Sequence, residues 1–398
     1  MSGLDPYGAD DRALSEALGG QPAYRLRQIR AWLARGVDDP AQMTDLPKAL
    51  RSRAAEVLAP SPQLLSHRTA DDGLTHKVLL EMPGSGSGSA STESIEAVLM
   101  LYPRDEDRPH GRATVCVSTQ AGCAMGCPFC ATGQAGLRRQ LSVGEVVRQV
   151  TVMQRMLASA TDLPAGAPAH VTNVVFMGMG EPLANVDATL GAVRWLADPE
   201  GGLGLSARSI TVSTIGLVPA MSRLAGLGLQ VRLALSLHAP NDALRDDLVP
   251  INRTHPISDV LAAADAYRVA TGRRVTFEYV LIDGVNDELA HARQLAGLLK
   301  PRGAAHVNLI PMNPTPGVSW TAPPVARQRD FLDILTRAGL PATIRANRGG
   351  NIDAACGQLH ASYQMASGRT LPMAQGAAER LQPSVAGLVP PSASGDSL

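Results

Sequence analysis

Hydrophobic and polar positions along this chain follow either the two-residue period of a strand or the ~3.6-residue period of a helix. From position 112 onward, segments with these two periods alternate. Short apolar or alternating runs predict strands at 113–118, 171–177, 209–213, 231–237, 275–281 and 306–310. Longer runs with an apolar residue every three or four positions predict helices at 142–159, 186–197, 218–225, 257–271, 288–299 and 325–338. Strands that alternate with helices pair in parallel, so the pattern predicts an α/β protein with an open, partial (β/α)6 barrel.

The first 70 residues predict a small helical domain that is locally basic. Apolar residues such as Ile29 and Leu33 recur at helical spacing between positions 21 and 56. The basic residues of this stretch outnumber its acidic ones, and they are Arg25, Arg27, Arg30, Arg35, Lys48, Arg51 and Arg53. Charge alone leaves open whether this face is simply solvated or binds RNA.

Residues 71–111 predict a β-hairpin that precedes the barrel. Two runs of alternating polarity, 75–81 and 95–102, are its strands. The residues between them, 83–90, are mostly glycine and serine and predict a flexible loop without chemistry. The other end of the chain, 366–398, is rich in proline, serine, glycine and alanine, and we expect it to be disordered.

Composition narrows the possible functions. Of the 398 residues 45% are hydrophobic, enough for a large core, and no apolar run approaches the ~20 residues of a membrane span. The first residues lack the basic and apolar parts of a signal peptide, so we expect a cytoplasmic location, where cysteines favour metal or catalytic roles over disulfides. Basic and acidic residues both number 36, so any affinity for RNA must come from local patches.

Three cysteines directly after the first barrel strand carry the strongest chemical signal. Cys123, Cys127 and Cys130 form the pattern C-x3-C-x2-C. Three thiolates this close can hold three irons of a [4Fe–4S] cluster and leave the fourth open, where the amino and carboxylate groups of S-adenosylmethionine can bind. A tetrahedral zinc site needs four ligands, and a zinc knuckle completed by Cys116 or Cys356 is the alternative. The spacing favours the cluster.

Further unusual residues follow the other barrel strands, at the edge where such barrels carry their chemistry. Glycines after the second strand would let the backbone approach a ligand, and Glu181 beside them could accept a hydrogen bond from an ammonium group. Hydroxyl, imidazole and amide side chains after later strands suit a ribose or a carboxylate. The predicted cofactor-binding residues are Gly180, Glu181, Ser213, Ser236, Leu237, His238 and Asn313.

The two remaining cysteines differ in their surroundings. Cys116 lies within the first barrel strand, where a small buried hydrophobic residue is the ordinary expectation. Cys356 follows the barrel, which we place at 112–347, in a glycine-rich segment without hydrophobic periodicity. A thiol on such a loop, here 348–365, can reach the edge of the barrel and act as a nucleophile. Cys356 is therefore a candidate catalytic residue, and the residues alone leave the role of Cys116 open.

Four segments in the same order, 114–123, 178–183, 236–242 and 353–359, resemble the RlmN family of bacterial radical SAM enzymes. The resemblance implies a radical SAM barrel with one [4Fe–4S] cluster, in a methyltransferase that acts on C2 of an adenosine in 23S rRNA and of adenosine 37 in tRNAs. It also implies that the basic N-terminal helices bind RNA. A one-electron reductant of the flavodoxin or ferredoxin type would be needed, and the chain would act as a monomer.

The resemblance assigns roles to three residues. One S-adenosylmethionine would methylate Cys356, and a second would yield the 5′-deoxyadenosyl radical that activates this methyl group for addition to adenine. Cys116 would release the enzyme–RNA adduct through a transient disulfide with Cys356, and Glu96 would be the base at C2. C2 of adenine is electron-poor and has no lone pair to attack a methyl donor, so a cofactor must carry the difficult step.

Two alternatives stay open. A Cfr-like enzyme would use the same cysteines to methylate C8 of the rRNA adenosine, and the motifs do not separate the two. A zinc-stabilised RNA-binding protein without enzymatic activity would use the cysteines as structural ligands. Metal analysis and a visible spectrum distinguish such a protein from one with an iron–sulfur cluster. The chromatographic behaviour of the modified nucleoside distinguishes C2 from C8.

Overall fold

The computed structural model describes residues 3–83, 92–303, 305–315, 317–345, 349–355 and 357–359. Three sequence predictions fall wholly or largely outside these ranges: the glycine- and serine-rich loop, the C-terminal tail and the catalytic Cys356. Among the described residues, no helix has the length and apolar composition that crossing a membrane requires.

A ten-stranded sheet forms the centre of the described molecule, in the order β1-β2-β3-β4-β7-β8-β9-β10-β11-β12. From β4 onward, neighbouring strands are parallel. These strands are β4 Arg112–Cys116, β7 Asn173–Phe176, β8 Ile210–Thr214, β9 Arg232–Ser236, β10 Val275–Leu281, β11 Ala305–Pro311 and β12 Ala342–Ile344. The first six confirm the predicted barrel strands, and β12 is an additional edge strand. Two shorter strands, β5 Gln120–Gly122 and β6 Leu137–Gln140, form a separate sheet.

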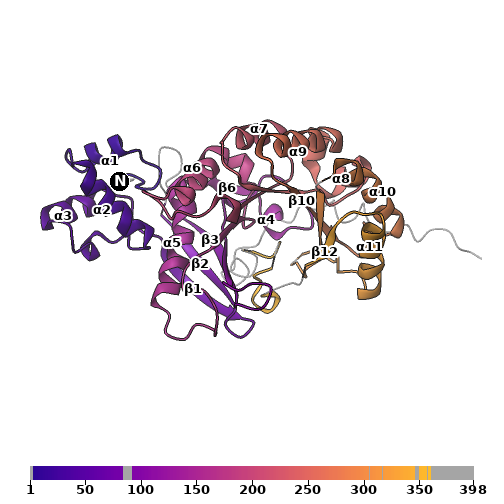
Figure 1. Cartoon of the computed structure of the whole chain (residues 1–398), viewed down its shortest axis with the longest axis horizontal. Helices are drawn as coiled ribbons and strands as arrows, with labels where there is room; N and C mark the ends of the chain where they lie inside the picture. The colour runs from indigo at the N-terminus through magenta and orange to yellow at the C-terminus, as the bar shows by residue number, and fades with distance from the viewer. Residues whose placement is uncertain are drawn as a thin grey trace, which may run out of the picture.

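Helices cover the outer face of the parallel strands (Figure 1). They are α5 Val143–Ser159, α6 Val186–Ala197, α7 Val218–Ala225, α9 Ile257–Thr271, α10 Leu289–Leu299 and α11 Val325–Arg337. Each agrees with a predicted helix to within one residue at either end. Within the described part of the barrel, two short α-helices were not predicted: α8 Asp242–Leu248 and α4 Ala131–Gln134. The predicted α/β barrel is therefore confirmed in both its strands and its helices.

The predicted hairpin is part of a three-stranded antiparallel extension. Strands β2 Thr75–Met82 and β3 Glu93–Tyr102 pair as expected. Strand β1 Gln63–Ala70 adds a third strand, which was missed because most of its residues are exposed and give no alternating pattern. Strand β3 also pairs with β4, so that Val98 lies opposite Cys116. The extension thereby continues the barrel sheet.

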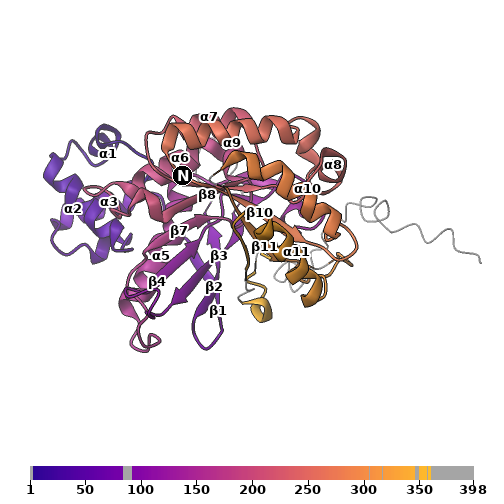
Figure 2. The same cartoon turned by 45° about the vertical axis from the view of Figure 1, so that its right-hand side comes forward.

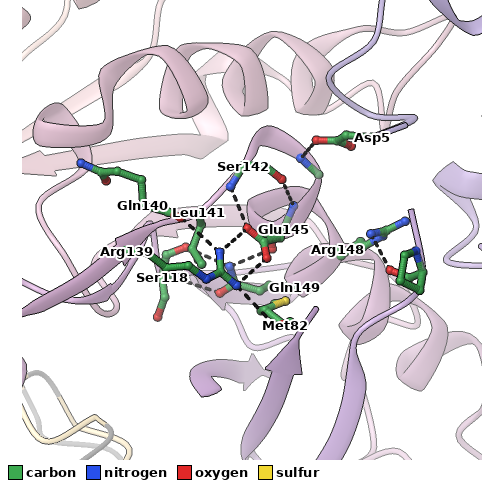
Figure 3. Close-up of polar contacts among 12 residues, drawn as sticks. Asp5, Met82, Ser118, Arg139, Gln140, Leu141, Ser142, Glu145, Arg148 and Gln149 are labelled. Atoms are coloured by element: carbon green, nitrogen blue, oxygen red, sulfur yellow. Dashed lines mark hydrogen bonds and ion pairs between the residues drawn. The ribbon is translucent and has the colours of Figure 1, made fainter. Parts of the chain in front are cut away.

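Three helices form the N-terminal part of the chain: α1 Asp11–Ala17, α2 Ala23–Ala34 and α3 Lys48–Val57. They lie at one side of the barrel, near α5 and α6, whereas α10 and α11 lie at the other side (Figures 1 and 2). The N–H of Gly144 in α5 donates to the Asp5 carboxylate (2.6 Å). Arg148 of α5 donates to the carbonyls of Ala59 and Pro60 at 2.7 and 2.9 Å (Figure 3). These contacts fix the N-terminal helices to the barrel.

Residues 349–355, which follow β12, lie against the first strands of the sheet. Strands β1 and β12 are the two edges of the described sheet. After β12, residues 349–355 reach the turn between β1 and β2, where the N–H of Gly349 donates to the Asp71 carboxylate (3.0 Å). The Lys77 ammonium of β2 donates to the Asp353 carbonyl (3.2 Å). Figure 1 shows this segment in yellow beside the strands of the extension.

Candidate active site in the barrel lumen

Two adjoining cavities occupy the lumen of the barrel. The upper cavity, about 180 Å³, lies at the C-terminal ends of the strands, and the lower cavity, about 240 Å³, extends toward their N-terminal ends. Because successive side chains of a strand point to opposite faces, alternate residues line the lumen along its length. The residues that line both cavities are Met177, Glu278, Ile310, Asn313 and Arg345. The two cavities therefore adjoin, and we treat them together as the candidate site.

The three cysteines of the C-x3-C-x2-C pattern line the upper cavity together. They lie on the loop between β5 and α4, and Cys123 and Cys127 are only 9% and 7% exposed. Burial is the main cause that raises the pKa of Cys123 to about 12. Burial, followed by the charges of Cys130 and Cys123, raises the pKa of Cys127. The three thiols are thus close enough to influence one another's ionisation.

This set of sulfur ligands fits an iron–sulfur cluster. Buried thiolates without a counter-charge are unfavourable, and a cationic metal bound to them reverses that cost. Three soft ligands from one short loop in one cavity are the donor set of a cluster with an open iron. Cys116, a candidate fourth ligand of a zinc knuckle, lines the lower cavity instead. Within the described ranges, no three His, Cys, Asp or Glu side chains are arranged to hold a single metal ion.

The glycine-rich turn after β7 brings the backbone close to this cavity. Gly180 has a φ of +96°, and a Cβ at this position would lie 2.5 Å from the Cβ of Gln120. Glycine alone satisfies both constraints without strain. Gln120, which sequence reasoning missed, accepts a hydrogen bond from the N–H of Glu181 (2.8 Å) and so fixes the turn. Gly180 and Glu181 both line the upper cavity.

The carboxylate of Glu181 is buried and held by the backbone. It accepts hydrogen bonds from the N–H groups of Leu183 and Ile215, each at 3.0 Å. Burial raises the pKa of Glu181 to about 7, although these hydrogen bonds act in the opposite direction. An ammonium group in the cavity would favour the charged carboxylate and bind to it. Glu181 can therefore hold the amino group of a cofactor.

His238 follows β9 and presents a neutral imidazole to the same cavity. Its φ of 60° is uncommon for a residue other than glycine, and Asn286 holds this conformation by donating to the His238 carbonyl (2.9 Å). Burial, followed by the charge of Arg245, lowers the pKa of His238 to about 3. Nδ1 accepts a hydrogen bond from the N–H of Val280 (3.1 Å), so we assign the remaining proton to Nε2. This Nε2–H group can donate to a ligand.

The structure also brings Ser213, Ser236 and Asn313 to the upper cavity. Of the predicted cofactor-binding residues, Leu237 does not line it, because the Leu237 side chain is fully buried in the core. Its N–H donates to the Glu278 carbonyl (3.0 Å), as in a strand. Any role of Leu237 toward a cofactor is therefore through the position of its neighbours.

A buried arginine that the sequence did not reveal holds the C-terminal ends of two strands. Arg245 of α8 donates to the carbonyls of Ile215, Ser236 and Leu237 at distances of 2.6, 3.2 and 3.1 Å. Its side chain is fully buried. In the sequence it stands in a charged stretch, 242–247, that is typical of an exposed helix. No local pattern distinguishes it.

Cys116 and Glu96 lie on neighbouring strands, and of these two residues Cys116 alone lines a cavity. Cys116 lines the lower cavity opposite Val98 of β3. Glu96 lies two residues earlier on β3 and is 2% exposed, whereas its place in the alternating pattern suggests a solvent-facing residue. The Glu96 carboxylate forms an ion pair with Lys77 of β2 (3.0 Å), and both side chains are buried. The extension therefore places a buried charged pair near the lower cavity, on the strand whose Val98 lines that cavity.

The residues on either side of Cys356 lie where the two cavities meet, whereas Cys356 itself lies outside the described residues. Ala355 lines the lower cavity and Gly357 lines the upper cavity. The Gly357 carbonyl accepts a hydrogen bond from the N–H of Ala131, next to the last cluster cysteine (2.9 Å). On the other side, the Asp353 carbonyl is bound by β2. The segment is thus anchored on both sides of position 356.

A buried polar network supports the cysteine loop (Figure 3). Arg139 of β6 forms a two-point ion pair with Glu145 of α5, with both N–O distances 2.8 Å. The same carboxylate accepts a hydrogen bond from the N–H of Ser142 (2.9 Å) and so caps the helix. Gln149 of α5 accepts from the N–H of Ser118 (2.7 Å) and donates to its carbonyl (2.8 Å). The network joins the end of β4, helix α5 and the β5–β6 sheet into one unit.

The seven basic residues between positions 21 and 56 differ in the contacts that they form. Arg30 is 13% exposed at its side chain and pairs with Asp11 (2.8 Å), so it stabilises the fold. Four others donate to nearby backbone carbonyls: Arg25, Arg35, Arg51 and Arg53. Arg27 and Lys48 are exposed and form no ion pair or hydrogen bond with the residues that the structure describes. These two cations are therefore candidates for contact with a partner.

Known proteins resemble this chain over most of its length. Residues 117–296 match the family model of the radical SAM superfamily. The probable dual-specificity RNA methyltransferase RlmN of Frankia alni is 53% identical over 358 residues, which are 88% of this chain and 81% of that protein. The protein of the same description from Thermobifida fusca is 49% identical over 367 residues, 91% of this chain and 94% of that protein.

A solved structure agrees in fold as well as in sequence. The crystal structure of a radical SAM methyltransferase from Sphaerobacter thermophilus has a TM-score of 0.80 and 48% sequence identity, and the match covers 90% of this chain and 99% of that chain. The superfamily match includes the three cysteines of the C-x3-C-x2-C pattern and the glycine-rich turn. The similarity in sequence and fold thus extends through the residues that line the upper cavity. This chain belongs to the RlmN family of dual-specificity RNA methyltransferases, within the radical SAM superfamily.

Proposed function

We propose that this chain, an RNA methyltransferase that uses S-adenosylmethionine and a [4Fe–4S] cluster, methylates C2 of a specific adenosine in 23S rRNA and of adenosine 37 in tRNAs. One observation carries the proposal: the thiols of the C-x3-C-x2-C loop and Cys116 line adjoining cavities, and the two neighbours of Cys356 line one cavity each. An adenine in this lumen would be within reach of both cysteine groups.

The upper cavity would hold the cofactors. Cys123, Cys127 and Cys130 would bind the cluster, and the buried carboxylate of Glu181 would bind the ammonium group of S-adenosylmethionine. When bound, the cluster and S-adenosylmethionine supply a one-electron reduction, the methyl group and a carbon-centred radical. The remaining polar groups of the cavity would orient the ribose, adenine and carboxylate of the cofactor, and they belong to Ser213, Ser236, His238 and Asn313.

Cys356 and Cys116 would act as a pair. The Cys356 sulfur would accept the methyl group and carry it to C2 of adenine as a thioether. Cys116 would then attack the Cys356 sulfur, so that a sulfur–sulfur bond forms and the bond from sulfur to the methylene carbon breaks, and this carbon would take up a proton to become the methyl group of the product. No disulfide joins Cys123, Cys127 and Cys130, and the transient disulfide of Cys116 with Cys356 stays a prediction.

Glu96 would remove the proton from C2. A base must be ionised before it acts, and a neighbouring cation favours the ionised carboxylate. Lys77 is such a cation, since it pairs with Glu96 and also donates to the Asp353 carbonyl. Lys77 would therefore fix the base relative to the segment that leads to Cys356.

The RNA must present an unstacked adenosine, because a base inside a duplex cannot enter a barrel lumen. The exposed Arg27 and Lys48 of the N-terminal helices would contact its phosphates. A one-electron reductant of the flavodoxin or ferredoxin type would reduce the cluster, and the chain would act as a monomer. Each of these partners is an expectation that follows from the proposed chemistry.

Nucleoside analysis tests the proposal. The protein, reconstituted anaerobically with its cluster, is incubated with S-adenosylmethionine, a reductant and either a tRNA or a 23S rRNA fragment. The RNA is then digested and separated by liquid chromatography with mass detection. We expect 2-methyladenosine from both RNAs. 8-Methyladenosine would instead establish the Cfr-like activity, and unmodified RNA from protein with a full cluster would refute the proposal.

A further inference from the structure

The lower end of the lumen is basic. Arg112 at the start of β4 and Arg232 at the start of β9 both line the lower cavity. Arg232 is exposed and Arg112 is half-buried, so the two lie at the opening of the lumen. Burial, followed by the charges of Arg273 and Arg112, lowers the pKa of Arg232. Both guanidinium groups therefore bring positive charge to the wall of the lower cavity.

These cations are not neutralised by the part of the chain that the structure describes. Neither Arg112 nor Arg232 forms an ion pair with a described carboxylate, and the Arg112 guanidinium lies over the Tyr102 ring at 4.0 Å. Glu278, which also lines the lower cavity, already accepts a hydrogen bond from Asn308 (2.8 Å) and pairs with Arg345 (3.5 Å). Positive charge at this end thus lacks a counter-charge.

A buried hydroxyl without a partner points to a ligand in the same place. Thr114 is 6% exposed and lines the lower cavity, and its Oγ1 has no hydrogen-bond partner among the described residues. Buried polar groups are nearly always satisfied, so an orphan group in a cavity wall is expected to bind what fills the cavity. Thr114 is two residues from Arg112 on β4, and the Nε of Arg112 lacks a hydrogen-bond partner as well.

The basic opening continues on the surface. A third cavity, about 350 Å³, shares Arg112 and Asn173 with the lower cavity and is also lined by His110 and His170. The path from the lumen to this cavity carries imidazole and guanidinium groups. An anionic chain leaving the lumen would meet donors along it.

We infer that the lower end of the lumen binds a backbone phosphate next to the target adenosine, through the guanidinium groups of Arg112 and Arg232 and the hydroxyl of Thr114. The inference rests on the proposed function, because it assumes that the adenine lies beside Cys116. Arg112 and Cys116 are four residues apart on β4, which separates their Cα atoms by roughly 13 Å. A nucleotide carries its base and its phosphate at opposite ends and would lie along this direction.

A double-mutant cycle between protein and RNA tests the contact. The probe is a fluorescein-labelled RNA stem-loop with one unpaired adenosine, either unmodified or with a neutral methylphosphonate on the 5′ or the 3′ side of that adenosine. Its affinity for the holoenzyme is measured by fluorescence anisotropy at several salt concentrations. The variants are Arg112→Gln and Arg232→Gln. Arg337→Gln is the matched control, because Arg337 is exposed on α11 and pairs only with Asp333 among the described residues.

We expect one methylphosphonate position to weaken binding to the unmodified protein by about tenfold, as for a lost charge-assisted hydrogen bond. Arg112→Gln and Arg232→Gln should weaken binding of the unmodified RNA and lower the salt slope by about one each, and the methylphosphonate should then cost little more. Arg337→Gln should change none of these values. The inference would be overturned if, for both methylphosphonate positions, the loss of binding free energy from the arginine substitution and that from the methylphosphonate simply added together.

Two further measurements separate a misfolded variant or a wrong reaction from a wrong contact. Arg112→Lys and Arg232→Lys keep a cation, so they should keep both the cluster absorbance and the methylphosphonate penalty. If a lysine variant that retains its cluster binds methylphosphonate RNA as tightly as unmodified RNA, the proposed phosphate contact is wrong. If the unmodified holoenzyme makes no methyladenosine, the proposed function fails. If it makes the product while the cycles are additive, the phosphate site alone fails.

Discussion

The two ends of the barrel lumen are built from the same strands but differ in burial and charge. On strand β8, Ser213 lines the upper cavity and Thr211 the lower one. On strand β9, Ser236 lines the upper cavity and Arg232 the lower one. At the upper end, burial dominates the pKa values of the thiols, the carboxylate and the imidazole. At the lower end, guanidinium groups reach solvent.

The difference in burial and charge suits the upper end to cofactor chemistry and the lower end to RNA binding. A buried end keeps water away from reactive groups and strengthens electrostatic contacts to a cofactor. An exposed cationic end attracts a polyanion without the cost of burying charge. Changes at the upper end should therefore abolish chemistry and leave RNA affinity, whereas changes at the basic surfaces should weaken RNA affinity and leave the cofactor site.

The largest effect is expected at the cluster loop. Cys123→Ala, Cys127→Ala or Cys130→Ala should each abolish cluster binding and methylation, because three thiolates leave no spare ligand. Iron and sulfide analysis with a visible spectrum measures the loss. Cys116→Ala is the matched control in the same lumen and should keep a full cluster. A full cluster in any one of the first three variants would contradict the assignment.

The buried pair beside the lumen should matter most for stability. Lys77→Met leaves the Glu96 carboxylate buried without its cation, which costs about 3–5 kcal/mol of unfolding free energy. Denaturant unfolding measures the change. The double variant Lys77→Met with Glu96→Gln should recover much of the loss but should not recover methylation. If Lys77→Met alone is as stable as the unmodified protein, the pair is not buried in solution.

A smaller loss of stability is expected at the glycine turn. Gly180→Ala forces alanine into a φ of +96° and against the Gln120 side chain, at a cost of about 1–3 kcal/mol. It should weaken S-adenosylmethionine binding, measured by calorimetry, and leave RNA affinity unchanged. Gly297→Ala in α10 is the control, since no atom lies within 4 Å of the added Cβ. If Gly180→Ala and Gly297→Ala changed stability and S-adenosylmethionine binding equally, the turn at Gly180 would not require glycine.

The smallest effect is expected on the N-terminal helices. Arg27→Gln and Lys48→Gln should each lower the salt slope of RNA binding by about one and leave cofactor binding intact. Arg30→Gln should instead lower the unfolding free energy, because Arg30 pairs with Asp11 within the fold. If Arg27→Gln and Lys48→Gln change neither the RNA affinity nor its salt dependence, these two residues face solvent and do not contact RNA.

Periodicity predicted the barrel well because most of its elements are long enough to show it. The six helices between the strands begin and end within one residue of their predicted positions. Strand β12 was missed because a three-residue edge strand carries no period, and α8 was missed because its charged residues resemble a surface segment. Strand β1 was missed because most of its residues are exposed and show no alternation of buried and exposed positions.

The candidate site was found where its signal is local in the sequence. The cysteine loop, the glycine turn and the polar residues at strand ends are short motifs, and all but Leu237 line the predicted lumen. Gln120 and Lys77 were missed because their partners are distant in sequence: Gln120 binds Glu181, 61 positions away, and Lys77 binds Asp353, 276 positions away. Such contacts depend on the fold and leave no pattern along the chain.

We expect RNA to be held covalently by Cys356 and released by Cys116. Cys116→Ala holoenzyme is incubated with tRNA, S-adenosylmethionine and a reductant, digested with nuclease and protease, and mapped by mass spectrometry. We expect an adenosine joined through a methylene group to the peptide that contains Cys356, and none in the double variant with Cys356→Ala. A Cys116→Ala protein that turns over normally, or an adduct on another residue, would contradict the account.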